Sequence, residues 1–304
     1  MTADRHDGQD AQDGQHGLDR DGFIAREGSL SRVAADFAPV VDAARGLITD
    51  AFGSCSGRLH SAYLYGSVPR GTAVPGVSDL DLLIALRHEP EPADRAAADA
   101  VESALDRAFP QVNGVGALLV SAATLVSERE RHDLGWFVAC LCTPLLGEDL
   151  AAVLPRYRPS SLLARETNGD LGLVLPRWRD RLAALGSDPA GPTGVPLTGV
   201  PEATSEAAMA ERRAFSRTVG RRLVRTGLTL VMPRWNGWTS DLVRSAEVFG
   251  RYYPARAAQM RLAAETGRTP TDDLAVLGVL VEDLGGWLAA EYSAAHGEKS
   301  PRGD

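Results

Sequence analysis

Residues 61–86 read SAYLYGSVPRGTAVPGVSDLDLLIAL, and they contain two apolar runs joined by a loop rich in glycine and proline. The runs occupy residues 61–65 and 80–86. Short apolar runs bounded by glycine and proline are typical of buried strands. We therefore predict two strands, the first of which stops at Gly66.

The pair Gly66-Ser67 is predicted to turn the chain from the first strand into a short helix. Glycine lets the backbone approach a ligand closely, and Ser67 is expected at the helix N-cap. Pro69 suits the first helical turn, where its missing N–H group costs nothing. The backbone N–H groups and the positive end of the helix dipole would hold phosphate, with the Ser67 hydroxyl and Arg70 as further donors.

Two acidic residues follow at the start of the second strand. Because side chains alternate along a strand, Asp79 and Asp81 should point to one face while Leu80 and Leu82 point into the core. Magnesium prefers one or two carboxylates together with substrate phosphates, and it would relieve the repulsion between two like charges. The sequence therefore predicts that Asp79 and Asp81 are the Mg²⁺ ligands and the catalytic residues of a phosphoryl or nucleotidyl transfer.

Apolar periodicity predicts the elements around this motif. Helices are expected over residues 30–52 and 97–108, and a third strand over residues 115–120. Past Pro155 the spacing is helical almost throughout, over the segments 171–185, 205–231, 242–253, 255–265 and 272–294. The predicted fold class is therefore α+β: an N-terminal domain with a small mixed sheet flanked by helices, followed by an all-α helical bundle.

Composition marks the expected domain boundaries. Residues 1–22 and 297–304 are polar and poor in large apolar side chains, so we expect disordered tails there. The domain with the motif then spans residues 23–155, and the helical domain spans residues 156–296. Within the helical domain, residues 186–202 are rich in proline and glycine, which is typical of a long loop or linker.

The charge and the apolar content exclude some classes of partner. The formal net charge of −8 argues against nucleic acid, whose binding usually requires a basic face. No run reaches the roughly 18 apolar residues that span a bilayer, and the first residues lack the basic start and apolar run of a signal peptide. We therefore expect no membrane partner and a cytoplasmic location. Of the cysteines, Cys140 and Cys142 are expected to be buried free thiols, and Cys55 completes an odd number without a CxxC pair.

The order and spacing of the motif residues resemble a known signature. Gly66-Ser67, eleven further residues and then Asp79 to Leu82 are similar to the motif of the polymerase β-like nucleotidyltransferase superfamily. The resemblance implies that residues 23–155 are a nucleotidyltransferase domain. It also implies that a nucleoside triphosphate is a substrate and that Mg²⁺ is the cofactor.

A second resemblance is to the aminoglycoside adenylyltransferases that modify streptomycin and spectinomycin. It rests on Tyr65 to Ser67 and Ser78 to Leu83, followed far downstream by Arg225 to Gly227, Ala246 to Phe249 and Tyr253-Pro254. In that family AMP passes from Mg-ATP to a hydroxyl of a small molecule. The resemblance thus implies ATP as the nucleotide and an aminoglycoside-like molecule or a natural-product intermediate as the acceptor. The implied nucleotide site consists of Gly66, Ser67, Arg70 and Ser78.

One position departs from the family pattern. The family carries a third carboxylate, a metal ligand or general base, on the strand after the long helix, and Gly116 stands in its place. Without a base, attack by the acceptor hydroxyl is expected to be slower by roughly 10²–10⁴-fold. Three explanations stay open: a nearby group supplies the base, the acceptor needs none, or the site binds nucleotide without turning it over. The nearby candidates are Glu128, Glu130, His132 and Asp133, although such a charged run is usually a solvated helix face.

Candidate acceptor contacts lie in the helical half of the chain. Trp235, Trp238 and Asp241 fall in one turn, with Thr239 or Ser240 as the expected cap of the next helix. Such a group either binds a cation or simply packs on the bundle. Further candidates are Trp178 and Glu211 as walls of an acceptor pocket, and Arg221, Arg222 and Arg225, which either reach a triphosphate or face solvent.

The main hypothesis is therefore an adenylyltransferase-like enzyme, and two rival functions stay beside it. The first rival is a nucleotide-binding or regulatory module that lacks the third carboxylate because it has lost its chemistry. The second is a protein that modifies or neutralises a partner polypeptide.

Overall fold

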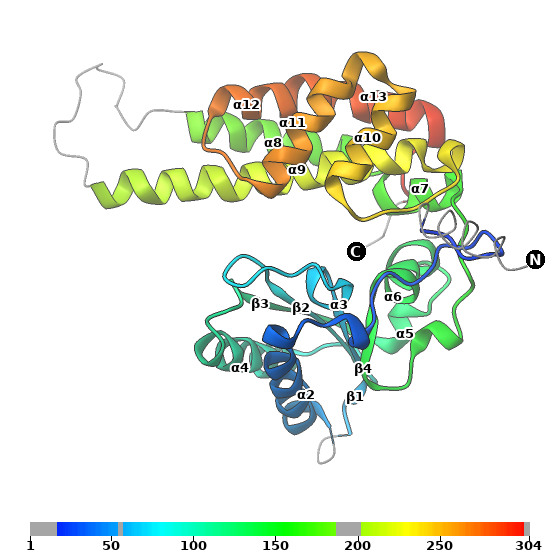
Figure 1. Ribbon diagram of the computed structural model, residues 1–304, viewed down its shortest axis with the longest axis vertical. Helices are drawn as coiled ribbons and strands as arrows, with labels where there is room; N and C mark the ends of the chain where they lie inside the picture. The colour runs from blue at the N-terminus through cyan, green and yellow to red at the C-terminus, as the bar shows by residue number, and fades with distance from the viewer. Residues whose placement is uncertain (1–16, 54–56, 187–201, 301–304) are drawn as a thin grey trace, which may run out of the picture. The chain divides into compact units, whose positions relative to one another are not determined.

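The structure is a computed structural model that describes residues 17–53, 57–186 and 202–300. These residues form two compact units (Figure 1). We call residues 18–158 the sheet unit, and the part that begins at Pro159 and includes Gly17 the helical unit. The predicted α+β fold is confirmed. Most residues of the predicted tails and of the predicted loop at 186–202 lie outside the described residues.

The sheet unit contains a mixed four-stranded sheet in the order β3-β2-β1-β4. β1 (Leu59–Tyr65) is antiparallel to β2 (Leu80–Leu86) and to β4 (Thr143–Gly147), while β2 is parallel to β3 (Val115–Ser121). The three predicted strands are therefore confirmed. The sequence pattern does not predict β4, because Pro144 and Gly147 weaken any strand signal, and a proline is accommodated here since β4 is an edge strand.

Alternation along β2 divides the apolar residues of the sheet unit into two clusters. The even-numbered residues from Leu80 to Leu86 pack with α2 (Ala38–Phe52) and α4 (Pro92–Ala108). The odd-numbered Leu83 and Ala85 pack on the other face, with residues of α5 (Ala122–Leu125) and α6 (Trp136–Leu141). Asp81 alternates with Leu82, so it belongs to this second face.

The helix predicted over residues 30–52 is shorter in the structure. Two single 3-10 turns, η1 (Leu30–Arg32) and η2 (Ala35–Phe37), come before α2, and Val33 between them is extended. Pro39 gives the physical reason, because it lacks the N–H group that would continue the helical hydrogen bonds toward the N-terminus. It therefore lies in the first turn of α2, where no such bond is needed.

The inner ends of both predicted tails are part of the folded units. Asp19 forms an ion pair with Arg156, and the Ser300 hydroxyl lies 3.0 Å from Glu166 Oε1. These partners are distant in the chain, so a composition argument cannot detect them. The structure thus differs from the expectation of disorder at residues 17–22 and 297–300.

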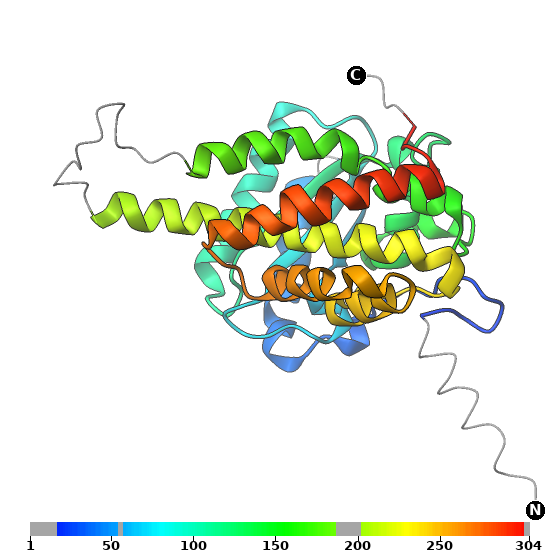
Figure 2. The same cartoon turned by 90° about the horizontal axis from the view of Figure 1, so that it is seen from above.

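The helical unit is built around α9 (Glu202–Trp235). Among the helices that pack on α9, Figure 2 shows these running alongside it: α8 (Leu171–Gly186), α10 (Leu242–Tyr252), α11 (Ala257–Arg268) and α13 (Gly286–His296). The unit also contains α7 (Ser161–Asn168), η5 (Pro254–Arg256), α12 (Leu274–Gly278) and the π-helical η6 (Val279–Gly285). The predicted helices past Pro155 are confirmed, except that residues 272–294 form α12, η6 and α13 in series. Within the described part of the chain, no helix combines the length and the apolar character that a bilayer span requires.

The cysteines at the end of α6 are buried and free, as predicted. Burial raises the pKa of the Cys140 thiol to about 12 and also raises that of Cys142. Both thiols are therefore protonated at neutral pH and act as small apolar side chains. Cys55 lies outside the described residues.

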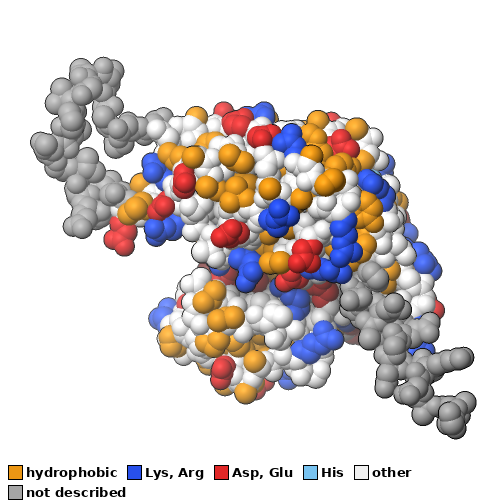
Figure 3. Space-filling view, turned by 45° about the horizontal axis from the view of Figure 1, so that its top comes forward, with side chains coloured by type: hydrophobic (Ala, Val, Ile, Leu, Met, Phe, Trp, Pro, Cys, Tyr) orange, Lys and Arg blue, Asp and Glu red, His pale blue; other side chains and the backbone are white. Residues whose placement is uncertain are grey.

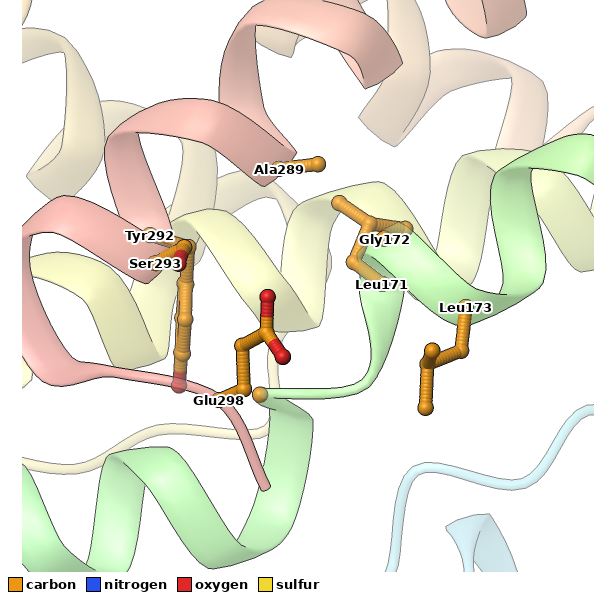
Figure 4. Close-up of a pocket in the computed structure, with 8 residues that line it drawn as sticks. Leu171, Gly172, Leu173, Ala289, Tyr292, Ser293 and Glu298 are labelled. Atoms are coloured by element: carbon orange, nitrogen blue, oxygen red, sulfur yellow. The ribbon is translucent and has the colours of Figure 1, made fainter.

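A small hollow of about 170 Å³ lies in the helical unit between the start of α8 and α13 (Figure 4). Leu171 and Leu173 line it from α8, Tyr292 lines it from α13, and the Glu298 side chain stands between them. Ligand pockets usually measure roughly 300–1,000 Å³. The hollow is therefore too small for a nucleotide.

Two glycines of α9 let α11 approach closely. A Cβ atom at Gly220 would lie 2.6 Å from the Ala263 carbonyl oxygen, and one at Gly227 would overlap the Met260 side chain. Residues seven apart share one face of a helix, so the two glycines form a single strip along the contact with α11.

We expect Gly220→Ala to destabilise the protein by about 1–2 kcal/mol, because overpacking outweighs the gain in helix propensity of about 1 kcal/mol. The free energy of unfolding, followed by circular dichroism in urea, checks this. Gly46→Ala is the matched control, because a Cβ at this exposed α2 position meets nothing within 4 Å and should stabilise. Equal stabilisation by both variants would contradict the packing argument.

Candidate active site

The chain bends sharply at Gly66, where β1 ends. Gly66 has φ 81° and ψ −152°, a backbone conformation that side chains other than glycine rarely adopt. It is the N-cap of α3 (Ser67–Arg70), so Ser67 is the first helical residue and not the cap that the sequence analysis expects. The reason is that the bend needs a positive φ, which only glycine provides without strain. The predicted turn from strand to short helix is thus present, shifted by one residue.

Asp81 touches this bend. The antiparallel register pairs Tyr65, the last residue of β1, with Asp81 of β2. A Cβ atom at Gly66 would overlap Asp81 Oδ2, so only a glycine leaves room for the carboxylate there. The start of α3 and a half-buried carboxylate therefore lie side by side.

Asp79 lies immediately before β2 and is held from the β3 side. Asn113 Nδ2 donates to Asp79 Oδ1 over 3.1 Å, and a Cβ atom at Gly114 would lie 3.9 Å from the same oxygen. This contact is not predicted from the sequence. The sequence feature that points to this contact is a polar side chain just before a strand that runs parallel to β2.

Ser78 organises the loop that leads to the acidic pair. Its Oγ accepts from the Val74 N–H group and its own N–H group donates to the Val74 carbonyl, each over 2.9 Å. Asn113 N–H in turn donates to the Ser78 carbonyl over 3.0 Å. The loop is therefore fixed on both sides, and the Ser78 hydroxyl has a structural partner in addition to the nucleotide contact that the resemblance implies.

Arg70, the other donor expected at the phosphates, lies at the end of α3. Its Nη1 atom is 3.5 Å from Glu27 Oε2. The arginine side chain is 32% exposed and the glutamate side chain 14% exposed. The guanidinium is thus half-buried and paired with a carboxylate from the N-terminal segment, a contact that the sequence analysis does not foresee.

Gly116 lies beside Asp81 on the neighbouring strand. The parallel register pairs the two residues directly, and a Cβ atom at Gly116 would meet nothing within 4 Å. The position at which the family carries its third carboxylate is therefore open and exposed. Among the described residues, no group of three or more histidine, cysteine, aspartate or glutamate side chains is arranged to hold a metal ion.

The charged run after β3 lies on the same face of the sheet as Asp81. Its π-helical turn, η3 (Arg131–Gly135), leads into α6, where the Phe137 ring packs edge-on against Tyr65 with a centroid distance of 4.9 Å. Tyr65 is the register partner of Asp81. Of the base candidates in this run, Glu128 is exposed and pairs with Arg131, whereas His132 and Asp133 are half-buried and Glu130 is buried. The expectation of a fully solvated helix face is therefore wrong for Glu130, because the chain folds back at η3 instead of continuing as one surface helix.

The acceptor candidates of the helical unit mostly have structural partners. Trp178 and Trp238 are buried, and Asp241 is the N-cap of α10, accepting from the Arg244 N–H group over 2.7 Å. The cap is thus Asp241 and not Thr239 or Ser240, because a carboxylate reaches the N–H group at N3. The remaining candidates are partnered on the surface: Glu211 with Arg181, Arg222 with Asp170, and Arg221 with the Gly267 carbonyl. Arg225 is exposed.

Comparison with known proteins identifies the class of the domain. Residues 51–113 match the family model described as the nucleotidyltransferase domain. This segment includes the Gly66 bend, α3 and both acidic residues. The chain therefore carries a nucleotidyltransferase domain, as the motif predicts.

A solved structure is also similar to this chain. It is the crystal structure of spectinomycin adenyltransferase AAD(9) from Enterococcus faecialis with ATP and spectinomycin. The similarity covers 84% of this chain and 98% of that chain, with a TM-score of 0.47 and 10% sequence identity. The search of curated proteins finds no match.

We expect Gly66→Ala to weaken Mg-ATP binding by about tenfold or more, because backbone strain of roughly 1–3 kcal/mol adds to the overlap with Asp81. Calorimetric titration checks this. Gly57→Ala is the matched control, since Gly57 also has a positive φ, 62°, but a Cβ there meets nothing within 4 Å. The assignment fails if both variants bind Mg-ATP like the wild type.

We expect Gly116→Asp to leave the fold intact and to lower the Mg²⁺ concentration needed for nucleotide binding by about tenfold, since a nearby carboxylate attracts a divalent cation strongly. A Mg²⁺ titration at fixed ATP concentration measures the effect. Leu118→Asp is the control, because Leu118 is 38% exposed and lies two residues further along β3. An unchanged Mg²⁺ requirement in Gly116→Asp would show that the open position does not face the metal site.

Proposed function

We propose that this chain transfers a nucleoside monophosphate, AMP from Mg-ATP, to a hydroxyl group of a small molecule. The observation that carries the proposal is the contact between the Gly66 bend and Asp81, inside the segment that matches the nucleotidyltransferase domain. This contact places the backbone N–H groups that begin α3 next to a carboxylate on a rigid strand. A phosphate and a divalent cation would therefore bind side by side.

The residues present fit a nucleotide with Mg²⁺. Asp79 and Asp81 are hard oxygen donors that would hold the cation, and Asn113 orients Asp79. Gly66 and Ser67 would hold the phosphates through backbone and hydroxyl donors, with Arg70 adding positive charge and Ser78 fixing the loop before Asp79. When bound, the cation neutralises charge that develops on the transferred group.

The proposed reaction is a displacement at the α-phosphorus of ATP. The acceptor oxygen forms a bond to this phosphorus, while the bond from the phosphorus to the oxygen that bridges to the β-phosphate breaks. Pyrophosphate leaves with the electron pair of that bond, and the hydroxyl proton passes to a base or to water. Since β3 carries Gly116 and no carboxylate at that position, the base candidates are His132 and Asp133 of η3, on the face of Asp81.

We assign nucleotide binding to a domain of residues 23–155 and acceptor binding to the helical domain of residues 156–296. The acceptor proposed is a small molecule, aminoglycoside-like or a natural-product intermediate. The net charge of −8 supports a small molecule rather than nucleic acid, and Figure 3 shows Arg and carboxylate side chains interspersed on the visible face. The proposed site of action is the cytoplasm, which would supply Mg-ATP.

We expect Asp79→Asn and Asp81→Asn each to lower pyrophosphate release by about 10²-fold or more, because each removes one carboxylate that balances the charge of the cation. Pyrophosphate release from Mg-ATP, with a panel of small-molecule hydroxyl acceptors, is the measurement. Asp99→Asn on α4 is the control, since Asp99 is exposed and pairs only with Arg95.

If wild-type and Asp81→Asn protein release pyrophosphate at equal rates, the catalytic assignment is wrong. Mg²⁺-dependent binding of ATP without product for any acceptor would instead support the rival nucleotide-binding module. A co-purifying polypeptide that gains the mass of AMP would identify a protein as the acceptor.

A further inference from the structure

The N-terminal residues 24–29 run across the sheet unit as a strap that ties together elements far apart in the sequence (dark blue in Figure 1). Arg26 forms a bidentate pair with Asp149, with N–O distances of 2.8 and 3.1 Å. The Glu27 N–H group donates to the Cys140 carbonyl over 2.9 Å. The backbone of the strap is therefore fixed on both sides of Glu27.

The strap also packs directly on α3. The Ser29 N–H group donates to the Pro69 carbonyl over 2.9 Å, and a Cβ atom at Gly28 would lie 3.1 Å from Pro69 Cβ. Just after α3, a Cβ atom at Gly71 would lie 2.7 Å from the Arg32 carbonyl oxygen, a few residues beyond the strap. This close packing leaves the C-terminal end of α3 and the strap little freedom to move apart, so Glu27 is held at a defined place beside Arg70.

Glu27 directs its carboxylate to Arg70. The carboxylate of Glu27 is the more buried of the two groups, while Arg70 keeps 32% of its side chain exposed. The Arg32 guanidinium bonds to the backbone carbonyl of Glu27, over 2.8 Å. The Glu27–Arg70 distance of 3.5 Å is long for an ion pair, so this pair is not a tight bidentate contact.

We propose that Glu27 is a positioning and specificity residue. It pairs with Arg70 when no nucleotide is bound, and the polyphosphate of a bound nucleotide replaces it as the partner of Arg70. This inference rests on the proposed function. A carboxylate next to the phosphate site opposes any anion, so only a ligand that carries enough negative charge displaces it from Arg70. Glu27 thus favours nucleoside triphosphates over monophosphates at the same site.

The proposal predicts that Glu27→Gln tightens nucleotide binding, whereas damage to the structure would weaken it. Glu27→Gln removes the competing charge, so it should bind Mg-α,β-methylene-ATP, a non-transferable ATP analogue, about two- to fivefold more tightly than the wild type. Binding of AMP should tighten by a larger factor, which lowers discrimination between the two. Calorimetric titration measures both constants.

Three variants keep the test specific. Asp36→Asn removes a neighbouring exposed negative charge of η2 and should leave both constants unchanged. In an Arg70→Gln background the further change Glu27→Gln should have little effect, because the two side chains act as one pair. Glu27→Asp keeps the charge and should keep wild-type discrimination.

Weaker or unchanged binding in Glu27→Gln, in protein that unfolds at the wild-type temperature, would overturn the proposal. If Glu27→Gln is unstable, Glu27→Asp decides the question, since lost discrimination in that variant would also contradict it. Asp81→Asn separates this outcome from failure of the proposed function. If Asp81→Asn abolishes Mg²⁺-dependent binding while Glu27→Gln has no effect, only the role of Glu27 is wrong.

Discussion

The antiparallel register between β1 and β2 determines the geometry of the candidate site. It pairs Tyr65 with Asp81, and one residue later the chain turns at Gly66 against the Asp81 carboxylate. A register shift of one residue would move every side chain of β2 to the other face and send Asp81 into the core. The register is maintained by buried pairs further along the ladder, such as Leu64 with Leu82. Core packing therefore places the Asp81 carboxylate beside the bend.

The same sheet explains why glycine in place of a carboxylate at position 116 would affect metal binding without affecting the fold. Gly116 occupies an exposed edge strand beside Asp81, and its open space is not used for packing. Two carboxylates supply less charge to a divalent cation than three, so phosphate oxygens and water must supply more of its coordination. In such a site the cation would bind mainly together with the nucleotide. Metal and nucleotide affinities would then depend strongly on each other.

Local sequence signals were sufficient for three of the four strands, the bend and the acidic pair, because each depends on residues next to one another in the chain. Alternation alone separates Asp81 from Leu80 and Leu82. The contacts that the sequence does not reveal join distant residues. Glu27 meets Arg70 and Asn113 meets Asp79, and no periodicity encodes these pairs. Caps were predicted one or two residues away from their places at both Gly66 and Asp241, because several neighbouring residues can cap and the tertiary path of the chain selects one of them.

The proposed phosphate site depends on tertiary structure. α3 has only four residues, far fewer than the roughly 12–15 that an isolated helix needs to be even marginally stable in water. It forms because β1 delivers the chain at a fixed position and because the strap, through Gly28 and Ser29, packs on Pro69. The strap that packs on α3 also carries Glu27, the residue proposed to compete with phosphate for Arg70. A change that loosens the strap would therefore affect both the stability of α3 and the proposed selection of nucleotide.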